Sequence, residues 1–147
     1  MNHRTGMIGL AALLMSCCGT VHAAECLPVA KAAWVRLPPV AMPMMAGFAR
    51  IENPCRTPIS IVGAESLAFE DVSLHETREE GGVSRMREVA ALPIAPGKAV
   101  ELKPGGLHLM LHGPYQPLAE GEKPVITLKL GDGRALPVVF EVRKRAP

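Results

Sequence analysis

The sequence HETREEGGVSRMREVAALPIAPGKAVELKPGGLHLM spans residues 75–110, and the rest of the chain is organised around it. It contains two pairs of chemically soft side chains, His75 with Met86 and His108 with Met110. Successive side chains of a β-strand point to opposite faces. In LHLM and the leucine that follows it, the three leucines therefore share one face, and the His–Met pair shares the other. We predict a strand that buries its leucines in a core and presents His108 and Met110 on the opposite side.

The other pair lies on a predicted β-hairpin. If residues 79–82 form its loop, His75 lies directly opposite Met86. If Gly81-Gly82 alone is the loop, the two side chains are diagonal neighbours on the same face. Either register places an imidazole and a thioether within reach of one ion. The spacing does not determine whether the two pairs meet, because that depends on the fold.

The donor atoms indicate which metal such a site would hold. Thioether sulfur is soft and neutral and binds Cu(I) well, whereas zinc, calcium and magnesium prefer harder or anionic donors. A single methionine usually fills a core, and a single histidine is usually a surface or hydrogen-bonded residue. The two members of each pair fall on the same face of the predicted strands, which favours a metal site. Met86 also lies between Arg85 and Arg87 in a polar strand, where a core methionine is not expected. We therefore predict one Cu(I) site, with the ligands His75, Met86, His108 and Met110.

Outward from this stretch, the chain consists of short apolar runs separated by proline and glycine, of which it has 14 each. Helical periodicity is weak, and many short strands between turn signals are typical of an antiparallel β-sandwich or barrel. The runs on either side of the GDG sequence at residues 131–133 predict a hairpin. The predicted strands cover residues 32–37, 47–52, 59–64, 69–76, 83–89, 99–102, 107–111, 125–130 and 136–142.

Residues 1–23 have the features of a secretory signal peptide. Arg4 precedes an apolar run at residues 7–14, and the VHA sequence at residues 21–23 resembles a cleavage site. The apolar run is too short to span a bilayer stably. Two alternatives stay open, namely a retained membrane anchor and lipidation of Cys17 in a lipobox-like LMSC sequence.

Removal of the signal peptide leaves a single domain, residues 24–147, with a formal charge of +1, because Arg4 is the only charged residue lost. This balanced charge argues against nucleic acid or an anionic membrane as a partner. Of four cysteines, only Cys26 and Cys55 remain. An even pair in an exported domain is typical of a disulfide, here between the mature N-terminus and the region after the second strand. The alternative is a pair of thiolate metal ligands, which an oxidising compartment disfavours.

The spacing of the four soft residues, His-x10-Met-x21-His-x-Met, resembles the signature of the periplasmic copper-A chaperone (PCuAC) family. The resemblance covers residues 30–143, nearly all of the mature chain. It implies a cupredoxin-like, antiparallel Greek-key β-sandwich that binds Cu(I) through those four side chains. It also implies delivery of copper to the dinuclear copper-A site of cytochrome c oxidase subunit II. Neighbouring sequence is similar too: AWVR at 33–36, AGF at 46–48, LHE at 74–76 and PGGLHLML at 104–111.

We expect a monomeric, periplasmic copper carrier rather than an enzyme, because no nucleophile–base arrangement or acid pair stands out. A thiol–disulfide copper chaperone is a further expected partner, whereas nucleic acid and stable membrane insertion are not expected. A blue-copper electron carrier needs a cysteine thiolate, and residues 75–110 contain no cysteine. The alternatives are a general periplasmic copper-binding or tolerance protein and a metal-free structural β-sandwich.

Three further features bear on the site. The tail at residues 141–147 has no histidine or methionine, so the second, Cu(II) site that some relatives carry on a C-terminal extension is not expected. The MPMM cluster at residues 42–45 fits two interpretations: a loop packed on the apolar rim, or a docking surface or auxiliary thioether near the copper. His112 is expected on the leucine side of its strand and is not counted as a ligand.

Overall fold

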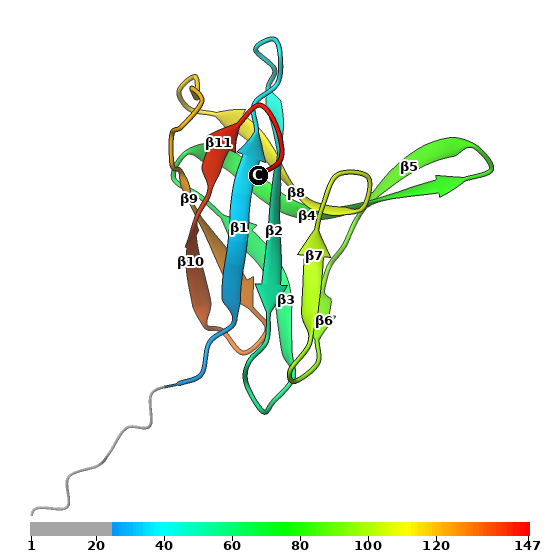
Figure 1. Cartoon of the computed structure of the whole chain (residues 1–147), viewed down its shortest axis with the longest axis vertical. Helices are drawn as coiled ribbons and strands as arrows, with labels where there is room; N and C mark the ends of the chain where they lie inside the picture. Colours follow the sequence, from blue (N-terminus) through cyan, green and yellow to red (C-terminus); the bar gives the residue numbers. More distant parts are fainter. Residues whose placement is uncertain (1–24) are drawn as a thin grey trace, which may run out of the picture.

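A computed structural model describes residues 25–147, and in that range the chain forms two packed β-sheets (Figure 1). The larger sheet contains β1 (Val29–Arg36), β2 (Met44–Glu52), β4 (Phe69–Glu80), β5 (Val83–Glu88), β7 (Ala99–Leu102), β8 (Leu107–Pro114) and β11 (Glu141–Arg143). The smaller sheet contains β3 (Ile59–Glu65), β6 (Leu92–Ile94), β9 (Val125–Leu130) and β10 (Ala135–Val139). Within residues 25–147, no helix is long and apolar enough to cross a membrane. The predicted signal peptide and Cys17 lie outside the described residues.

The order of strands in the larger sheet brings distant parts of the sequence together. It runs β11-β1-β2-β8-β4-β5, and β7 pairs with the second half of β2. The smaller sheet runs β10-β9-β3-β6. β8 therefore lies at the centre of the larger sheet, between β2 and β4. The His–Met pair of β8 therefore lies between β2 and β4, in the middle of the larger sheet.

The core between the sheets is built by strict alternation along the central strands. Leu109 and Leu111 on β8 are fully buried, and Val72 and Leu74 on neighbouring β4 are nearly so. Leu107, at the start of β8, is only partly buried and packs against the same cluster. The prediction that the leucines of β8 face the core is thus confirmed, and the even-numbered residues of β8 lie on the outer face.

Every predicted strand is present at least in part, although β2, β4 and β8 extend beyond their predicted bounds, to Met44, Glu80 and Pro114. Three further differences have local causes. β1 begins at Val29 rather than at residue 32, because a bulge between Lys31 and Trp34 interrupts the alternation. β6 was not predicted, since it has only three residues and a central proline, and proline normally argues against a strand. The run at residues 136–142 is two strands, because the chain changes sheet at the buried Phe140.

The two strand pairings at the C-terminal end differ in direction. β9 and β10 form the predicted antiparallel hairpin around the GDG turn. β11 instead pairs with β1 in parallel, so the sheet is not purely antiparallel. The parallel pair closes one edge of the larger sheet with a segment more than a hundred residues away in the sequence.

Cys26 and Cys55 form the predicted disulfide. The bond ties the segment before β1 to the loop that follows β2, at the end of the sandwich where β2 finishes at Glu52. The guanidinium of Arg134 donates to the carbonyl oxygen of Cys26 at 2.6 Å, which fixes the same segment to the β9–β10 turn. The segment around Cys26 is therefore held to both sheets.

The β4–β5 hairpin projects from the sandwich as an arm, defined here as residues 77–88 (Figure 1). Its turn is Gly81-Gly82 alone, and both glycines have positive φ, as a two-residue hairpin turn requires. Of the two predicted registers, the structure therefore shows the shorter loop, with Thr77 opposite Met86 and His75 opposite Glu88. Because all six residues of β5 are exposed, the arm is held by its ladder rather than by a core.

Candidate metal centre

The pairing of β4 with β8 brings the two predicted His–Met pairs together. His75 lies directly opposite His108, and Ser73 lies opposite Met110. Directly opposite residues of an antiparallel pair have side chains on the same face. The ring centres of the two histidines are 6.1 Å apart. With metal–nitrogen bonds of about 2 Å, two imidazoles at this separation can share one ion, so this part of the face suits a mononuclear site.

His108 is held in one orientation by the backbone. Its side chain is 94% buried, and its Nδ1 lies 2.9 Å from the carbonyl oxygen of Gly106. That oxygen also accepts a hydrogen bond from the backbone N–H of Thr77 at 3.1 Å. With Nδ1–H donating to the carbonyl, Nε2 carries the free lone pair. Such a hydrogen bond to the far nitrogen is how metal-binding histidines are usually oriented.

His75 shows an unsatisfied nitrogen. Its Nε2 lies 3.0 Å from the hydroxyl of Ser73, whereas its Nδ1 is buried without a hydrogen-bond partner. An unpaired buried polar atom is costly, and a bound metal ion would satisfy it. Burial lowers the pKa of His75 below its ordinary value of 6.5, and the neighbouring His108 imidazole acts in the same direction. His75 is therefore kept in the neutral form that binds metal.

The two methionines differ in their surroundings. Met110 lies on the central strand β8 between Ala46 of β2 and Ser73 of β4, and it is partly buried. Met86 lies on the arm, 52% exposed, one diagonal step from His75 across the β4–β5 ladder. Diagonal cross-strand neighbours are about 7–8 Å apart at their Cα atoms, which a long side chain spans. The structure thus places three donors on the sheet and the fourth, exposed, beside them.

Two carboxylates border the histidines. Glu88 is the residue directly opposite His75 on β5, and Asp71 lies on the same face of β4. Both act to raise the pKa of His75 against the larger effect of burial. Among residues 25–147, however, no group of three or more His, Cys, Asp or Glu side chains could hold a metal ion. A complete donor set in this region therefore depends on the methionines.

The expectation for His112 was wrong. His108, Met110 and His112 are alternate residues of one strand, so all three lie on the same face, opposite Leu109 and Leu111. The pairing of His112 with Met44 on β2 and Asp71 on β4 agrees with this placement. His112 also lowers the pKa of His75 through its charge, which requires that it be nearby.

The groups that orient the two histidines are Ser73 and the Gly106 carbonyl, and neither was predicted from the sequence. Ser73 has a signal that could have revealed it, since it lies two residues before His75 and so shares its face. The carbonyl of Gly106 has none, because any residue at that position offers the same oxygen. Its role follows only from the turn of the chain into β8.

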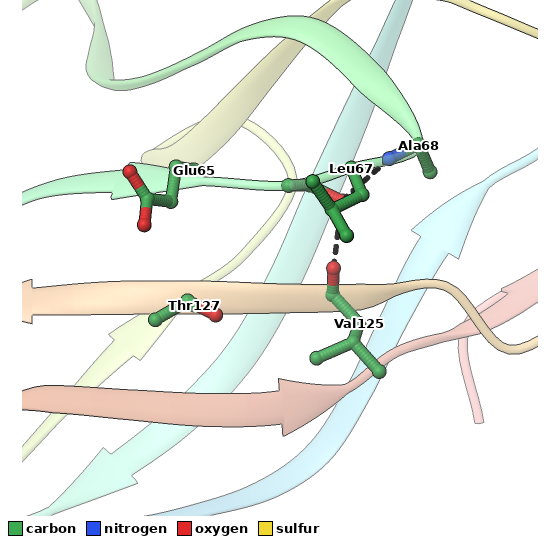
Figure 2. A pocket seen from close by; sticks show the side chains of 6 residues that line it. Glu65, Leu67, Ala68, Val125 and Thr127 are labelled. Atoms are coloured by element: carbon green, nitrogen blue, oxygen red, sulfur yellow. Dashed lines mark hydrogen bonds between the residues drawn. The ribbon is translucent and has the colours of Figure 1, made fainter.

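A hollow in the described part of the chain lies away from the histidines. It lies between the β3–β4 turn and β9, where the Ser66 hydroxyl donates to the Val125 carbonyl (Figure 2). It is lined by Glu65, Ser66, the exposed Leu67, Ala68, Val125 and Thr127. No histidine, methionine or cysteine lines this hollow, so it offers no soft donor.

Comparison with known proteins identifies the family. The family model described as "Putative lipoprotein LpqE-like" matches residues 29–142, which is nearly the whole of the described chain. The chain is a member of the LpqE-like, PCuAC-type family. The predicted family resemblance is thereby confirmed.

This LpqE-like protein is similar to a curated protein in sequence and to several solved structures in fold. "Putative lipoprotein Lxx21020" of Leifsonia xyli is 36% identical over 121 residues, which cover 82% of this chain and 71% of the relative. The solution structure of Cu(I)-DR1885 from Deinococcus radiodurans is 35% identical, with 83% of each chain covered and a TM-score of 0.66. The apo PCuAC domain from PmoF1 has a TM-score of 0.67 at 18% identity, covering 80% of this chain and 94% of that domain. These likenesses confirm the cupredoxin-like β-sandwich.

Proposed function

We propose that this LpqE-like protein is an exported copper carrier that binds one Cu(I) through His75, Met86, His108 and Met110. The observation that supports the proposal is the strand register, which puts these four residues on one face, together with the buried Nδ1 of His75 that has no hydrogen-bond partner. The likeness to a protein whose structure was solved with Cu(I), at 35% identity, supports the same metal.

The arrangement suits a carrier better than a permanent cofactor site. All four donors are neutral, and none is a thiolate. No anionic ligand therefore compensates the positive charge of the copper ion. Met86 is half-exposed on the arm, at the boundary with solvent. An acceptor protein can therefore replace this ligand first, while the two histidines and Met110 still hold the ion. We infer that the protein transfers copper and catalyses no reaction of its own.

The acceptor that we propose is the copper-A site of cytochrome c oxidase subunit II, and a thiol–disulfide copper chaperone is a second candidate partner. The description of the family and the name of the Leifsonia relative both refer to lipoproteins, which supports export. They also favour lipidation of Cys17 as the alternative to cleavage after residue 23. The intact mass of the exported protein distinguishes a lipidated Cys17 from a free residue 24 at the N-terminus.

A binding titration tests the proposal directly. In the presence of a competing Cu(I) chelator, we expect one tightly bound Cu(I) per chain, which is colourless because its d shell is filled. Oxidation to Cu(II) should not produce an intense visible band either, because there is no thiolate ligand. Zn(II) is expected to bind much more weakly, because thioethers are poor zinc ligands. Absence of tight Cu(I) binding, or equal affinity for Zn(II), would reject the soft-donor site. Transfer of Cu(I) to a purified, copper-free subunit II domain then tests the acceptor separately.

The affinity for Cu(I) should fall in acid through proton competition at the histidines. Imidazole binds metal only when neutral, so protons compete with copper as the pH falls, whereas thioether sulfur has no such requirement. Because the pKa of His75 is lowered, its contribution should be lost only at pH values below its ordinary 6.5. His75→Met should flatten this acidic part of the profile and keep some affinity. Competition with a chelator between pH 7.5 and about pH 5 measures the affinity for Cu(I) as a function of pH. An affinity of the wild type that does not change over this range would show that the histidines are not ligands.

A further inference from the structure

A second set of potential ligands lies next to the proposed site on the same face. Met44 of β2, His112 of β8 and Asp71 of β4 form one row across three adjacent strands, with His112 in the middle. Directly opposite side chains in such a row have Cβ atoms about 5 Å apart. The row therefore places an imidazole between a thioether and a carboxylate, and the proposed function uses none of the three.

A backbone hydrogen bond keeps β2 and β8 paired at the end where this row lies. The backbone N–H of Gly113 donates to the carbonyl oxygen of Pro43 at 2.8 Å, immediately beyond the Met44–His112 pair. Gly113 has a positive φ, and a Cβ at this position would overlap the side chain of Glu70. The positive φ favours glycine at this position, and the hydrogen bond to Pro43 keeps the strand end beside Met44 paired.

The surroundings of Met44 differ from those of its neighbour in the sequence. Met45 is 94% buried and belongs to the core, which is the ordinary role of a methionine. Met44 points to the other side of β2 and is 40% exposed. Its thioether is thus not used for packing in the core. His112 is partly buried beside it, and the exposed Asp71 adds a negative charge that favours a bound cation.

We propose that Met44 and His112, with Asp71 beside them, form a second and weaker Cu(I) position. It rests on the proposed function, because it extends the same row of donors. Residues two apart on a strand are separated by about 7 Å, so Met110 lies between His108 on one side and His112 on the other. An ion at the outer position is one such step from Met110. The outer position therefore provides a route by which copper enters or leaves the inner site at the sheet end opposite the arm.

The outer position is weaker because it has fewer donors. It offers one imidazole and one thioether from the ladder, against two of each at the inner site. A chelator that leaves the inner site full should therefore empty the outer one. A second, weak Cu(I) position is thus compatible with the single tightly bound Cu(I) of the proposed function. The same soft-donor chemistry predicts that Ag(I), which is stable in air, occupies both positions in the same order.

Nuclear magnetic resonance of protein labelled with ¹³C at the methionine methyl groups tests this order of filling. During titration with Ag(I), the methyl signals of Met86 and Met110 should shift over the first equivalent. The signal of Met44 should shift over the second equivalent, and the buried Met45 should stay unchanged throughout. If Met86 and Met110 do not respond, the proposed function fails. If they respond and Met44 does not, the outer position alone is rejected.

Matched variants separate this pair from a general attraction of methionines for silver. Met44→Leu and His112→Phe should each weaken binding of the second equivalent by about tenfold or more and leave the first unchanged. Met42→Leu is the control, because Met42 is also exposed, at 46%, but has no ladder partner beside His112. An equal loss in the Met42 variant would show a diffuse methionine cluster and overturn the proposal. Circular dichroism of each metal-free variant confirms that the fold is retained.

Discussion

Replacing His108 with phenylalanine is expected to lower the affinity for Cu(I) at neutral pH by about 100-fold or more. Removing a group that merely orients a metal ligand already costs about 10–100-fold in affinity, and His108 is proposed as a ligand itself. Phenylalanine has a similar size, and the side chain at this position is 94% buried, so the packing against the sheet is largely kept. Competition with a chromophoric Cu(I) chelator measures the change.

Methionine variants provide the comparison for this result. Met110→Ala should also lower the affinity, but by a similar factor at every pH, because a thioether does not titrate. Met45→Leu is the control, since Met45 lies on the opposite face of β2 in the core and should leave the affinity unchanged. If Met110→Ala binds Cu(I) like the wild type, Met110 is not a ligand and serves only for packing. If His108→Phe does so while its metal-free form is folded, the proposed site is wrong.

Removal of the disulfide should have the largest effect on stability. The bond joins residues 29 positions apart, and a loop of that length corresponds to about 3.5 kcal/mol of unfolding free energy in the loop-entropy model. The double variant Cys26→Ala and Cys55→Ala should therefore unfold at clearly lower urea concentration. Its melting temperature should fall by roughly 10–20 °C for a domain of this size.

The same variant separates stability from binding. The disulfide lies where β2 ends, whereas the candidate site lies beside the first half of β2, at Met44 to Gly47. At temperatures where the double variant is still folded, its affinity for Cu(I) should match that of the wild type. Unchanged stability would show that other contacts, such as the Arg134 hydrogen bond to the Cys26 carbonyl, hold the segment by themselves.

Local parts of this structure could be predicted because local rules are sufficient for them. The leucines of β8 lie in the core and Met110 lies on the other face, since alternation depends only on the strand being extended. Gly81-Gly82 forms a two-residue turn, because two consecutive residues with positive φ are easy for glycine and costly for others. The same alternation places His112 on the face of Met110. The expectation that His112 lies on the leucine side was therefore a wrong application of the rule, since the sequence contained the information needed.

The two His–Met pairs, a bond between the two mature cysteines and an all-β fold could all be predicted from the sequence. These predictions rest on alternation along a strand, on turn residues and on the number of cysteines, none of which depends on the order of the strands. The pairing of β4 with β8, which places His75 opposite His108 across 33 positions of sequence, could not be predicted in this way. Nor could the contact between the Gly106 carbonyl and His108 or the place of Met44 beside His112. Strand order depends on how all the apolar faces are buried together, and no single segment carries that information.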